Sequence, residues 1–154
     1  GIRSVLREET SAGYALRRLG SSVIQRAAGP LLIDGSIDTS YIDAMIQSFE
    51  TNGSYFVYCP GVALAHAGPG DGVHFFGLSL IRLKKPVPFG HRLHDPVSWC
   101  ICLAIQEKAK ESIVLRLMDL LSNPRILREM DGIRDRKELL AYLLEKEREE
   151  SYEQ

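Results

Sequence analysis

The chain has 154 residues, of which 45% are hydrophobic and 25% charged, and its net charge is −1 at pH 7. This length suffices for one domain with a sizeable core, so we expect residues 1–154 to form a single domain. The balanced charge excludes a general attraction to nucleic acid or to an anionic membrane, and no apolar run is long enough to span a bilayer.

The amino-terminal part of the sequence indicates helices with one uncertain segment. Residues 1–9 predict a short lead helix, and Tyr14 to Leu19 is a weak strand candidate. Ser21 is suited to cap a helix, and Gly29-Pro30 is expected to bend or interrupt it because proline lacks the backbone donor.

The central part of the sequence predicts one helix followed by strands. Asp38 is expected to be the N-cap of the helix. Residues 55–59 and 62–65 resemble a short hairpin, and residues 74–83 alternate as a strand does. Residues 97–105 are nearly all apolar, as in a central strand that is covered on both faces.

Helices return after the last predicted strand. Residues 111–121 carry apolar side chains at helical spacing, and Asn123-Pro124 is typical of the start of a short helix. Asp135 and Glu138 form a possible capping box for a final helix. Helices on both sides of central strands predict an α/β fold, a three-layer sandwich with a mixed sheet between helical layers.

The three cysteines, Cys59, Cys100 and Cys102, have no spacing typical of a disulfide scaffold. We interpret them as reduced, buried residues of a cytoplasmic protein, an expectation supported by the lack of a secretory signal at the start of the sequence. Cys100 and Cys102 would point to one face of a strand, but no further ligand completes a metal site, and we expect none.

The most unusual stretch is residues 60–73, where an apolar segment brings His66 into a glycine-rich turn. An unprotonated histidine nitrogen can attack phosphorus and later leave again. Small neighbours would let another protein approach, and the N–H groups of a glycine turn can hold phosphoryl oxygens. The alternative is an inert histidine bonded at a strand end, and the residue types by themselves favour that alternative.

The sequence around this histidine resembles the type-2 EIIA family of the bacterial phosphotransferase system, and within it the ascorbate-type branch. That branch has a proline-glycine pair, aliphatic residues and a proline around its phosphorylated histidine. This chain matches that pattern at seven positions: Pro60, Gly61, Val62, Ala63, Leu64, His66 and Pro69. Further matching segments lie at 41–45, 53–57, 72–73, 77–80, 83–87, 89–91, 95–97 and 119–121.

The resemblance implies a phosphocarrier. His66 would accept a phosphoryl group from phospho-HPr and pass it to a cysteine of a IIB protein or domain. The chain would bind no nucleic acid directly and would not enter the membrane, although it would associate with a membrane IIC protein through IIB. No metal or organic cofactor is implied, and the acceptor cysteine would belong to IIB.

The chain also departs from the family pattern. Ala65 replaces a proline, and Ala67 and Gly68 stand where glycine and arginine are common. A second histidine that many members carry is absent from 107–112, where Lys110 is the alternative cation. We therefore expect the phosphoryl charge to be held mainly by backbone N–H groups of the turn. The predicted phosphate-binding residues are Ala67, Gly68, Gly70, Gly72, His74 and Lys110.

Two other functions stay open at this point. Domains of this kind also occur at the ends of transcriptional regulators, where phosphorylation reports sugar supply, and the chain could be a degenerate module that no longer transfers phosphate. His91 and His94 are interpreted as surface or structural residues, and Asp95 as a residue that ends a loop. Nothing in the sequence identifies the sugar.

Overall fold

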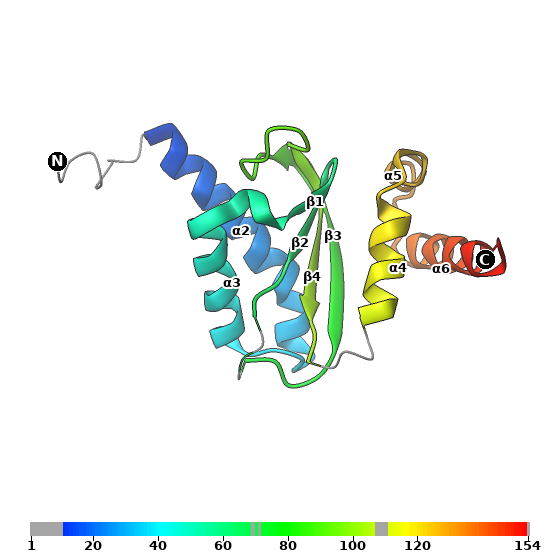
Figure 1. Ribbon diagram of the computed structural model, residues 1–154, viewed down its shortest axis with the longest axis horizontal. Coiled ribbons are helices and arrows are strands. Elements are labelled where there is room, and N and C mark those ends of the chain that lie inside the picture. Colours follow the sequence, from blue (N-terminus) through cyan, green and yellow to red (C-terminus); the bar gives the residue numbers. More distant parts are fainter. Residues whose placement is uncertain (1–10, 69, 71, 107–110, 154) are drawn as a thin grey trace. The chain divides into compact units, whose positions relative to one another are not determined.

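Four strands of the computed structural model form one mixed sheet in the order β1-β2-β4-β3 (Figure 1). They are β1 (Val57–Cys59), β2 (Val62–Ala65), β3 (Gly77–Val87) and β4 (Val97–Ala104). Strand β2 runs parallel to β4, whereas β1 pairs with β2 and β3 pairs with β4 in antiparallel fashion. The predicted α/β fold with a mixed central sheet is confirmed.

The structure describes residues 11–68, 70, 72–106 and 111–153. The chain divides into two compact units, Gly1–Gln106 and Glu107–Gln154. The first unit contains the sheet and two long helices, and the second contains three helices. The predicted lead helix over 1–9 lies outside the described residues.

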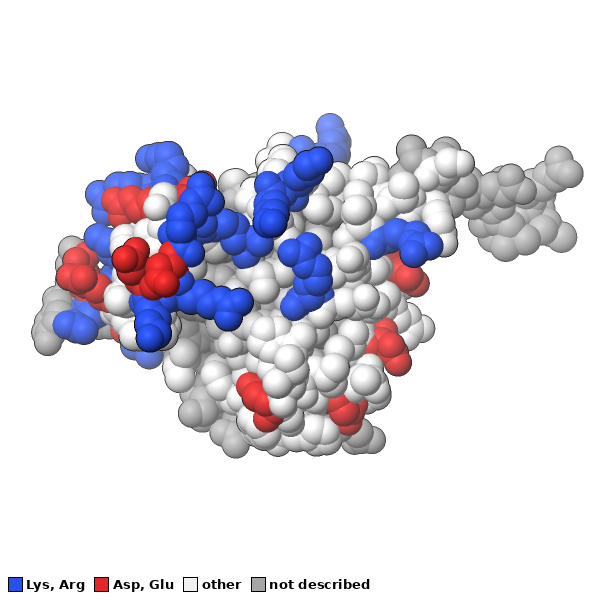
Figure 2. Space-filling view, turned by 180° about the vertical axis from the view of Figure 1, so that it is seen from behind, with Lys and Arg blue, Asp and Glu red and all other residues white. Residues whose placement is uncertain are grey.

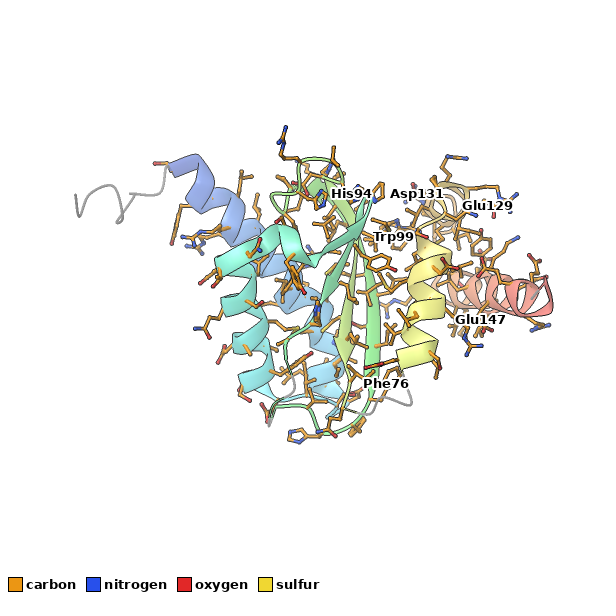
Figure 3. All side chains as sticks on the ribbon, in the orientation of Figure 1. Phe76, His94, Trp99, Glu129, Asp131 and Glu147 are labelled. Carbon is orange, nitrogen blue, oxygen red and sulfur yellow. The ribbon has the colours of Figure 1, made fainter. Side chains whose placement is uncertain are left out.

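Strand β4 is the most buried part of the sheet, as its apolar sequence predicts. Seven of its eight residues are buried. The side chains of Cys100 and Cys102 face the main hydrophobic core, which also includes Met45 of α3. On the opposite face Trp99 is 2% exposed, and the Arg82 guanidinium lies 4.6 Å from the centre of its ring (Figure 3).

Helices α2 (Ser11–Ile33) and α3 (Thr39–Asn52) pack against each other, and α2 contacts β3 and β4 of the sheet. The prediction of a strand at Tyr14 to Leu19 is wrong, because this segment is part of α2. Its alanine, leucines and arginines are good helix formers, and its exposed position provides no neighbouring strand with which to pair.

Gly29-Pro30 was predicted to bend or interrupt the helix, and the interruption does not occur. Helix α2 continues to Ile33, and the Asp34 N–H donates to the Pro30 carbonyl at 3.1 Å. Proline removes one intrahelical hydrogen bond, but it lies in the last turn, where that loss is limited. Burial of Ala27 and Leu31 on the same face of the helix favours continuation of the helix.

Strand β3 begins three residues later and ends four residues later than the predicted strand at 74–83. The amino-terminal part of that prediction pairs elsewhere: Val73 forms an isolated bridge with Ile37, and the N–H of His74 donates to the Ser36 carbonyl at 2.8 Å. Because β3 is an edge strand, it can include Pro86 without losing a hydrogen bond inside the sheet.

The second unit contains α4 (Glu111–Leu121), α5 (Pro124–Asp131) and α6 (Arg136–Glu153). The predicted cap at Asn123 is confirmed, because its side chain accepts from Arg125 N at 3.0 Å. The side chain of Asp135 accepts from Glu138 N at 3.1 Å, which is one of the two hydrogen bonds of the predicted capping box. Arg116 and Glu147 form an ion pair between α4 and α6 with an N–O distance of 3.1 Å.

The surface carries charged side chains of both signs (Figure 2). Figure 2 shows Lys and Arg side chains in blue and Asp and Glu side chains in red on the surface of this chain, whose net charge is −1. Among the helices that the structure describes, none is both long enough and apolar enough to cross a membrane.

Candidate functional site

His66 directly follows strand β2, at the end of the sheet where α3 begins (Figure 1). The hairpin that precedes it turns at Gly61, whose φ of 79° is readily adopted only by glycine. Three of the four residues of β2 are buried, whereas His66 is half-buried. The buried strand therefore positions the backbone of His66, and the half-buried residue is partly accessible to solvent.

One ring nitrogen of His66 has a defined partner. Its Nδ1 lies 2.9 Å from the carbonyl oxygen of Leu64. A carbonyl oxygen only accepts, so Nδ1 carries the hydrogen and donates it. In the neutral ring, Nε2 is then the nitrogen with the free electron pair. This is the protonation pattern that a nucleophilic imidazole needs.

Two aromatic residues of the short 3₁₀ segment η1 (Gly53–Phe56) flank the His66 ring. The centre of the buried Phe56 ring is 5.5 Å from the centre of the imidazole, and that of Tyr55 is 6.4 Å away. Tyr55 is 72% exposed. The buried Phe56 ring thus lies on the interior side of the imidazole, and the exposed Tyr55 ring lies on its outer side.

The backbone after His66 is held by Tyr41 of α3. The Ala67 N–H donates to the Tyr41 hydroxyl oxygen at 3.1 Å, and that hydroxyl donates to the Leu103 carbonyl at 2.6 Å. The N–H of Ala67, which was predicted to bind phosphate, is therefore already occupied. A phosphate-binding role for Ala67 stays a prediction, and it would require this bond to open.

Gly72 and His74 lie against the start of α3. The Asp38 N–H donates to the Gly72 carbonyl at 3.0 Å, and a Cβ on Gly72 would stand 2.7 Å from Tyr41 N. His74 is half exposed, and its Nε2 lies 3.1 Å from Oδ2 of Asp38, which is the N-cap of α3 as predicted. The structure thus brings His74 to Asp38, and its phosphate-binding role stays a prediction.

The other predicted phosphate-binding residues are less constrained. Gly68 and Gly70 are exposed. Lys110 lies outside the described residues, as do Pro69 and Asp71 of the same turn. A phosphate-binding role for the backbone N–H groups of this turn therefore remains a prediction. At Gly72, the close approach to α3 by itself requires a residue without a side chain.

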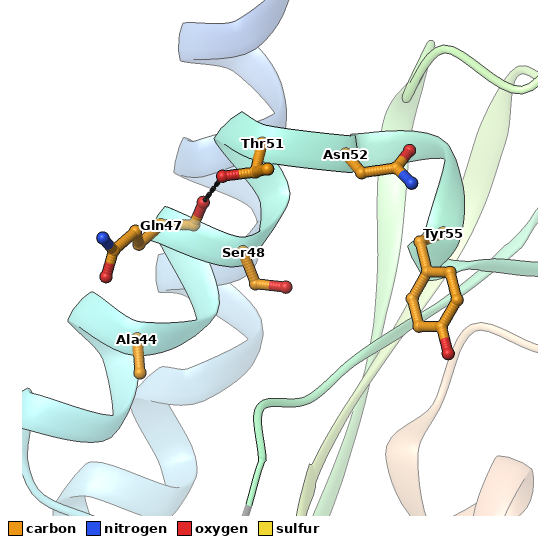
Figure 4. A pocket seen from close by; sticks show the side chains of 6 residues that line it. All are labelled: Ala44, Gln47, Ser48, Thr51, Asn52 and Tyr55. Atoms are coloured by element: carbon orange, nitrogen blue, oxygen red, sulfur yellow. Dashed lines mark hydrogen bonds between the residues drawn. The ribbon is translucent and has the colours of Figure 1, made fainter.

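A shallow depression of about 390 Å³ lies along α3 and reaches Tyr55 (Figure 4). Its lining has no charged side chain. The lining residues are Ala44, Gln47, Ser48, Thr51, Asn52 and Tyr55.

Sequence reasoning did not single out Tyr55 or Tyr41 as residues of the site. Their only sequence signal is their place in segments that match the family pattern, 53–57 and 41–45.

All three cysteines are buried, reduced thiols, as expected. Burial raises the pKa of Cys59 to about 11 and that of Cys102 to about 12, and it also raises the pKa of Cys100. A thiol with such a pKa is almost entirely protonated near neutral pH, which makes it a poor nucleophile. No group of three or more potential metal ligands occurs among the described residues.

We expect the predicted phosphorylation to be equal in the unaltered chain and in a folded Cys59→Ser, Cys100→Ser, Cys102→Ser variant. The elevated pKa values also predict that the native thiols react slowly with iodoacetamide at pH 8 and faster as the pH rises toward 11. Alkylation of the folded chain followed by mass measurement tests this. Rapid labelling at pH 8, or loss of phosphorylation in the folded variant, would contradict the interpretation.

The loop between β3 and β4 has a structural role. The carboxylate of Asp95 accepts from the N–H groups of Phe89, Gly90 and His91 at 2.8–3.0 Å, which confirms that it organises the end of a loop. The ring of His94, which Figure 3 labels, stacks on the ring of His91 with centres 4.3 Å apart.

Comparison with known proteins places this geometry in a family. Residues 20–146 match the family described as phosphoenolpyruvate-dependent sugar phosphotransferase system, EIIA 2. The ascorbate-specific EIIA component of Escherichia coli K12 is 31% identical over 106 residues, which are 68% of this chain and 69% of that protein.

Solved structures of enzyme IIA domains have a similar fold. The mannitol-specific cryptic enzyme IIA from Escherichia coli has a TM-score of 0.69 and 28% identity, covering 80% of this chain and 84% of that one. The fold also matches the complex of mannitol enzyme IIA with phosphorylated enzyme IIB from Escherichia coli, with a TM-score of 0.68, 18% identity, and coverage of 80% and 86%. The chain belongs to the type-2 EIIA family of the phosphoenolpyruvate-dependent sugar phosphotransferase system.

Proposed function

We propose that the chain is a phosphocarrier that accepts a phosphoryl group on Nε2 of His66 and transfers it to a cysteine of a IIB protein. The observation that carries this proposal is the hydrogen bond from Nδ1 to the Leu64 carbonyl, because it leaves Nε2 unprotonated in the neutral ring. Membership of the EIIA family supports a role in phosphotransfer.

In the first step, the electron pair of Nε2 attacks the phosphorus of the phosphohistidine of HPr in line with the bond that breaks. A new N–P bond forms, and the donor imidazole leaves with the electron pair of its own N–P bond. His66 keeps its proton on Nδ1, so its ring becomes cationic while the hydrogen bond to Leu64 becomes charge-assisted and stronger.

In the second step, a thiolate of the IIB partner attacks the same phosphorus, and His66 leaves as a neutral imidazole. Both steps need positioning and charge stabilisation more than additional catalytic groups. The match to a mannitol IIA that forms a complex with phosphorylated IIB supports a IIB partner for this chain. We propose that the chain acts in the cytoplasm, with residues 1–154 as one domain that reaches a membrane IIC protein only through IIB.

The direct test is incubation of the chain with enzyme I, HPr and phosphoenolpyruvate, followed by measurement of the intact mass. We expect one acid-labile phosphate per chain, because a phosphoramidate bond to histidine hydrolyses in acid. Omission of HPr should prevent labelling. Absence of labelling in the complete mixture would favour the degenerate-module alternative.

The exposed ring of Tyr55 predicts a role in partner contact. We expect Tyr55→Ala to raise the KM for phospho-HPr several-fold with little change in kcat, because an interface aromatic contributes roughly 1–2 kcal/mol. Labelling by phosphoramidate, a small phosphoryl donor that needs no protein interface, should be unchanged. Tyr58→Ala is the matched control, since Tyr58 is an exposed tyrosine for which no ring contact to His66 is found. A normal KM in Tyr55→Ala would contradict this role.

A further inference from the structure

Tyr41 links three parts of the first unit that are distant in sequence. Its side chain is 4% exposed, and it projects from the first turn of α3. Its hydroxyl donates to the Leu103 carbonyl near the end of β4 at 2.6 Å. The same oxygen accepts the N–H of Ala67, the residue directly after His66, at 3.1 Å.

The bond to Ala67 restricts His66 itself. The peptide unit between the two residues is planar, so the direction of the Ala67 N–H sets the orientation of that whole unit. The orientation of this unit determines ψ of His66, and the backbone in turn determines which side-chain rotamers are allowed. A hydrogen bond at Ala67 therefore restricts the direction in which the imidazole projects.

The turn after His66 is attached to the first turn of α3 at two places. The first is Ala67, whose N–H donates to the Tyr41 hydroxyl oxygen. The rest of the turn is attached to the same helix turn, because Gly72 approaches Tyr41 N closely and accepts from the Asp38 N–H. The start of α3 thus holds the turn at both Ala67 and Gly72.

The hydroxyl is suited to a permanent structural bond. Desolvation raises the pKa of Tyr41 to about 12, so its proton stays in place at physiological pH and continues to donate to Leu103. The two hydrogen bonds satisfy both a buried carbonyl and an N–H beside the nucleophile, and removal of the oxygen would leave both groups without this partner.

We propose that Tyr41 is a positioning residue for His66, which aligns the imidazole for phosphoryl transfer through the Ala67 N–H. This inference rests on the proposed phosphocarrier function. Tyr41 does not touch the reacting atoms. It acts through the backbone that carries them, by the hydrogen bond to the Ala67 N–H.

The test is Tyr41→Phe, which removes only the hydroxyl. In single-turnover transfer from phospho-HPr we expect the maximal rate to fall about tenfold, because misalignment of reacting groups is costly. The dependence of the rate on HPr concentration should stay unchanged, because no docking contact is lost. Labelling by phosphoramidate should fall far less, because a small donor in solution can approach the imidazole in any of its orientations.

Two further measurements do not depend on activity. In ¹⁵N NMR spectra we expect the His66 ring of the unaltered chain to carry its proton on Nδ1, and Tyr41→Phe to populate both tautomers. The Ala67 amide should exchange slowly with solvent in the unaltered chain and faster in the variant. Tyr142→Phe, which removes a hydroxyl bonded to Glu129 in the second unit, is the matched control and should change neither property.

The outcomes separate the two proposals. If the unaltered chain accepts no phosphate from either donor, the phosphocarrier function is wrong. The NMR and exchange data then still show whether Tyr41 orients the His66 ring. If Tyr41→Phe transfers phosphate at the normal rate with an unchanged His66 tautomer, the positioning role is wrong. Rapid exchange of the Ala67 amide in the unaltered chain also overturns it, even if the variant were too unstable to study.

Discussion

His66→Ala is expected to abolish phosphorylation of the chain by enzyme I, HPr and phosphoenolpyruvate. The imidazole is the proposed nucleophile, and its Nδ1 bond to Leu64 leaves Nε2 free to attack. Alanine has no group that can form an N–P bond, so the loss should be complete and independent of donor concentration. Intact-mass measurement should show no acid-labile phosphate, and phosphoramidate should fail to label the variant as well.

The matched control is His94→Ala. His94 is half-buried in the β3–β4 loop and stacks on His91. The variant therefore removes an imidazole from another part of the chain and leaves His66 in place. We expect it to be labelled to the same extent as the unaltered chain. Circular dichroism should show that both variants are folded. Full labelling of His66→Ala would place the phosphoryl group on another residue and would reject the proposed mechanism.

Gly72→Ala is expected to destabilise the chain by about 1–3 kcal/mol, the usual cost of an extra methyl group in a tightly packed site. The new Cβ would lie 2.7 Å from Tyr41 N and 2.8 Å from the Ser40 hydroxyl oxygen, so the turn or the start of α3 must move. Because the same turn carries His66, phosphorylation should also become slower. Urea unfolding and the labelling rate measure the two effects.

Gly132→Ala is the control for this variant. Gly132 has a φ of −82°, and a Cβ at this position would lie 3.5 Å from the Glu129 carbonyl oxygen, an ordinary van der Waals contact. We expect this variant to change the free energy of unfolding by less than about 0.5 kcal/mol. Normal stability of Gly72→Ala in the same experiment would show that the turn does not pack against α3 as described.

Local patterns in the sequence were sufficient where a structure depends on neighbouring residues. Asp38, Asn123 and Asp135 are helix caps as predicted, because a cap bonds to N–H groups two or three positions away. The apolar run at 97–105 predicted β4 correctly, since burial on both faces requires apolar side chains throughout. Residues 14–19 are helical because their own types favour a helix, which the strand prediction overlooked. At Pro30 the packing of the buried face of α2 outweighed the local effect of proline.

The sequence by itself determined that His66 ends an apolar strand and enters a glycine-rich turn. The bond from Nδ1 to Leu64 is local in sequence, although no residue pattern reports it. The tertiary structure decided which aromatic rings flank the imidazole and how the turn is held. Tyr41 reaches Ala67 across 26 positions and Leu103 across 62. No sequence periodicity reports such contacts, because they exist only after α3 packs on the sheet and brings one hydroxyl between two distant strand ends.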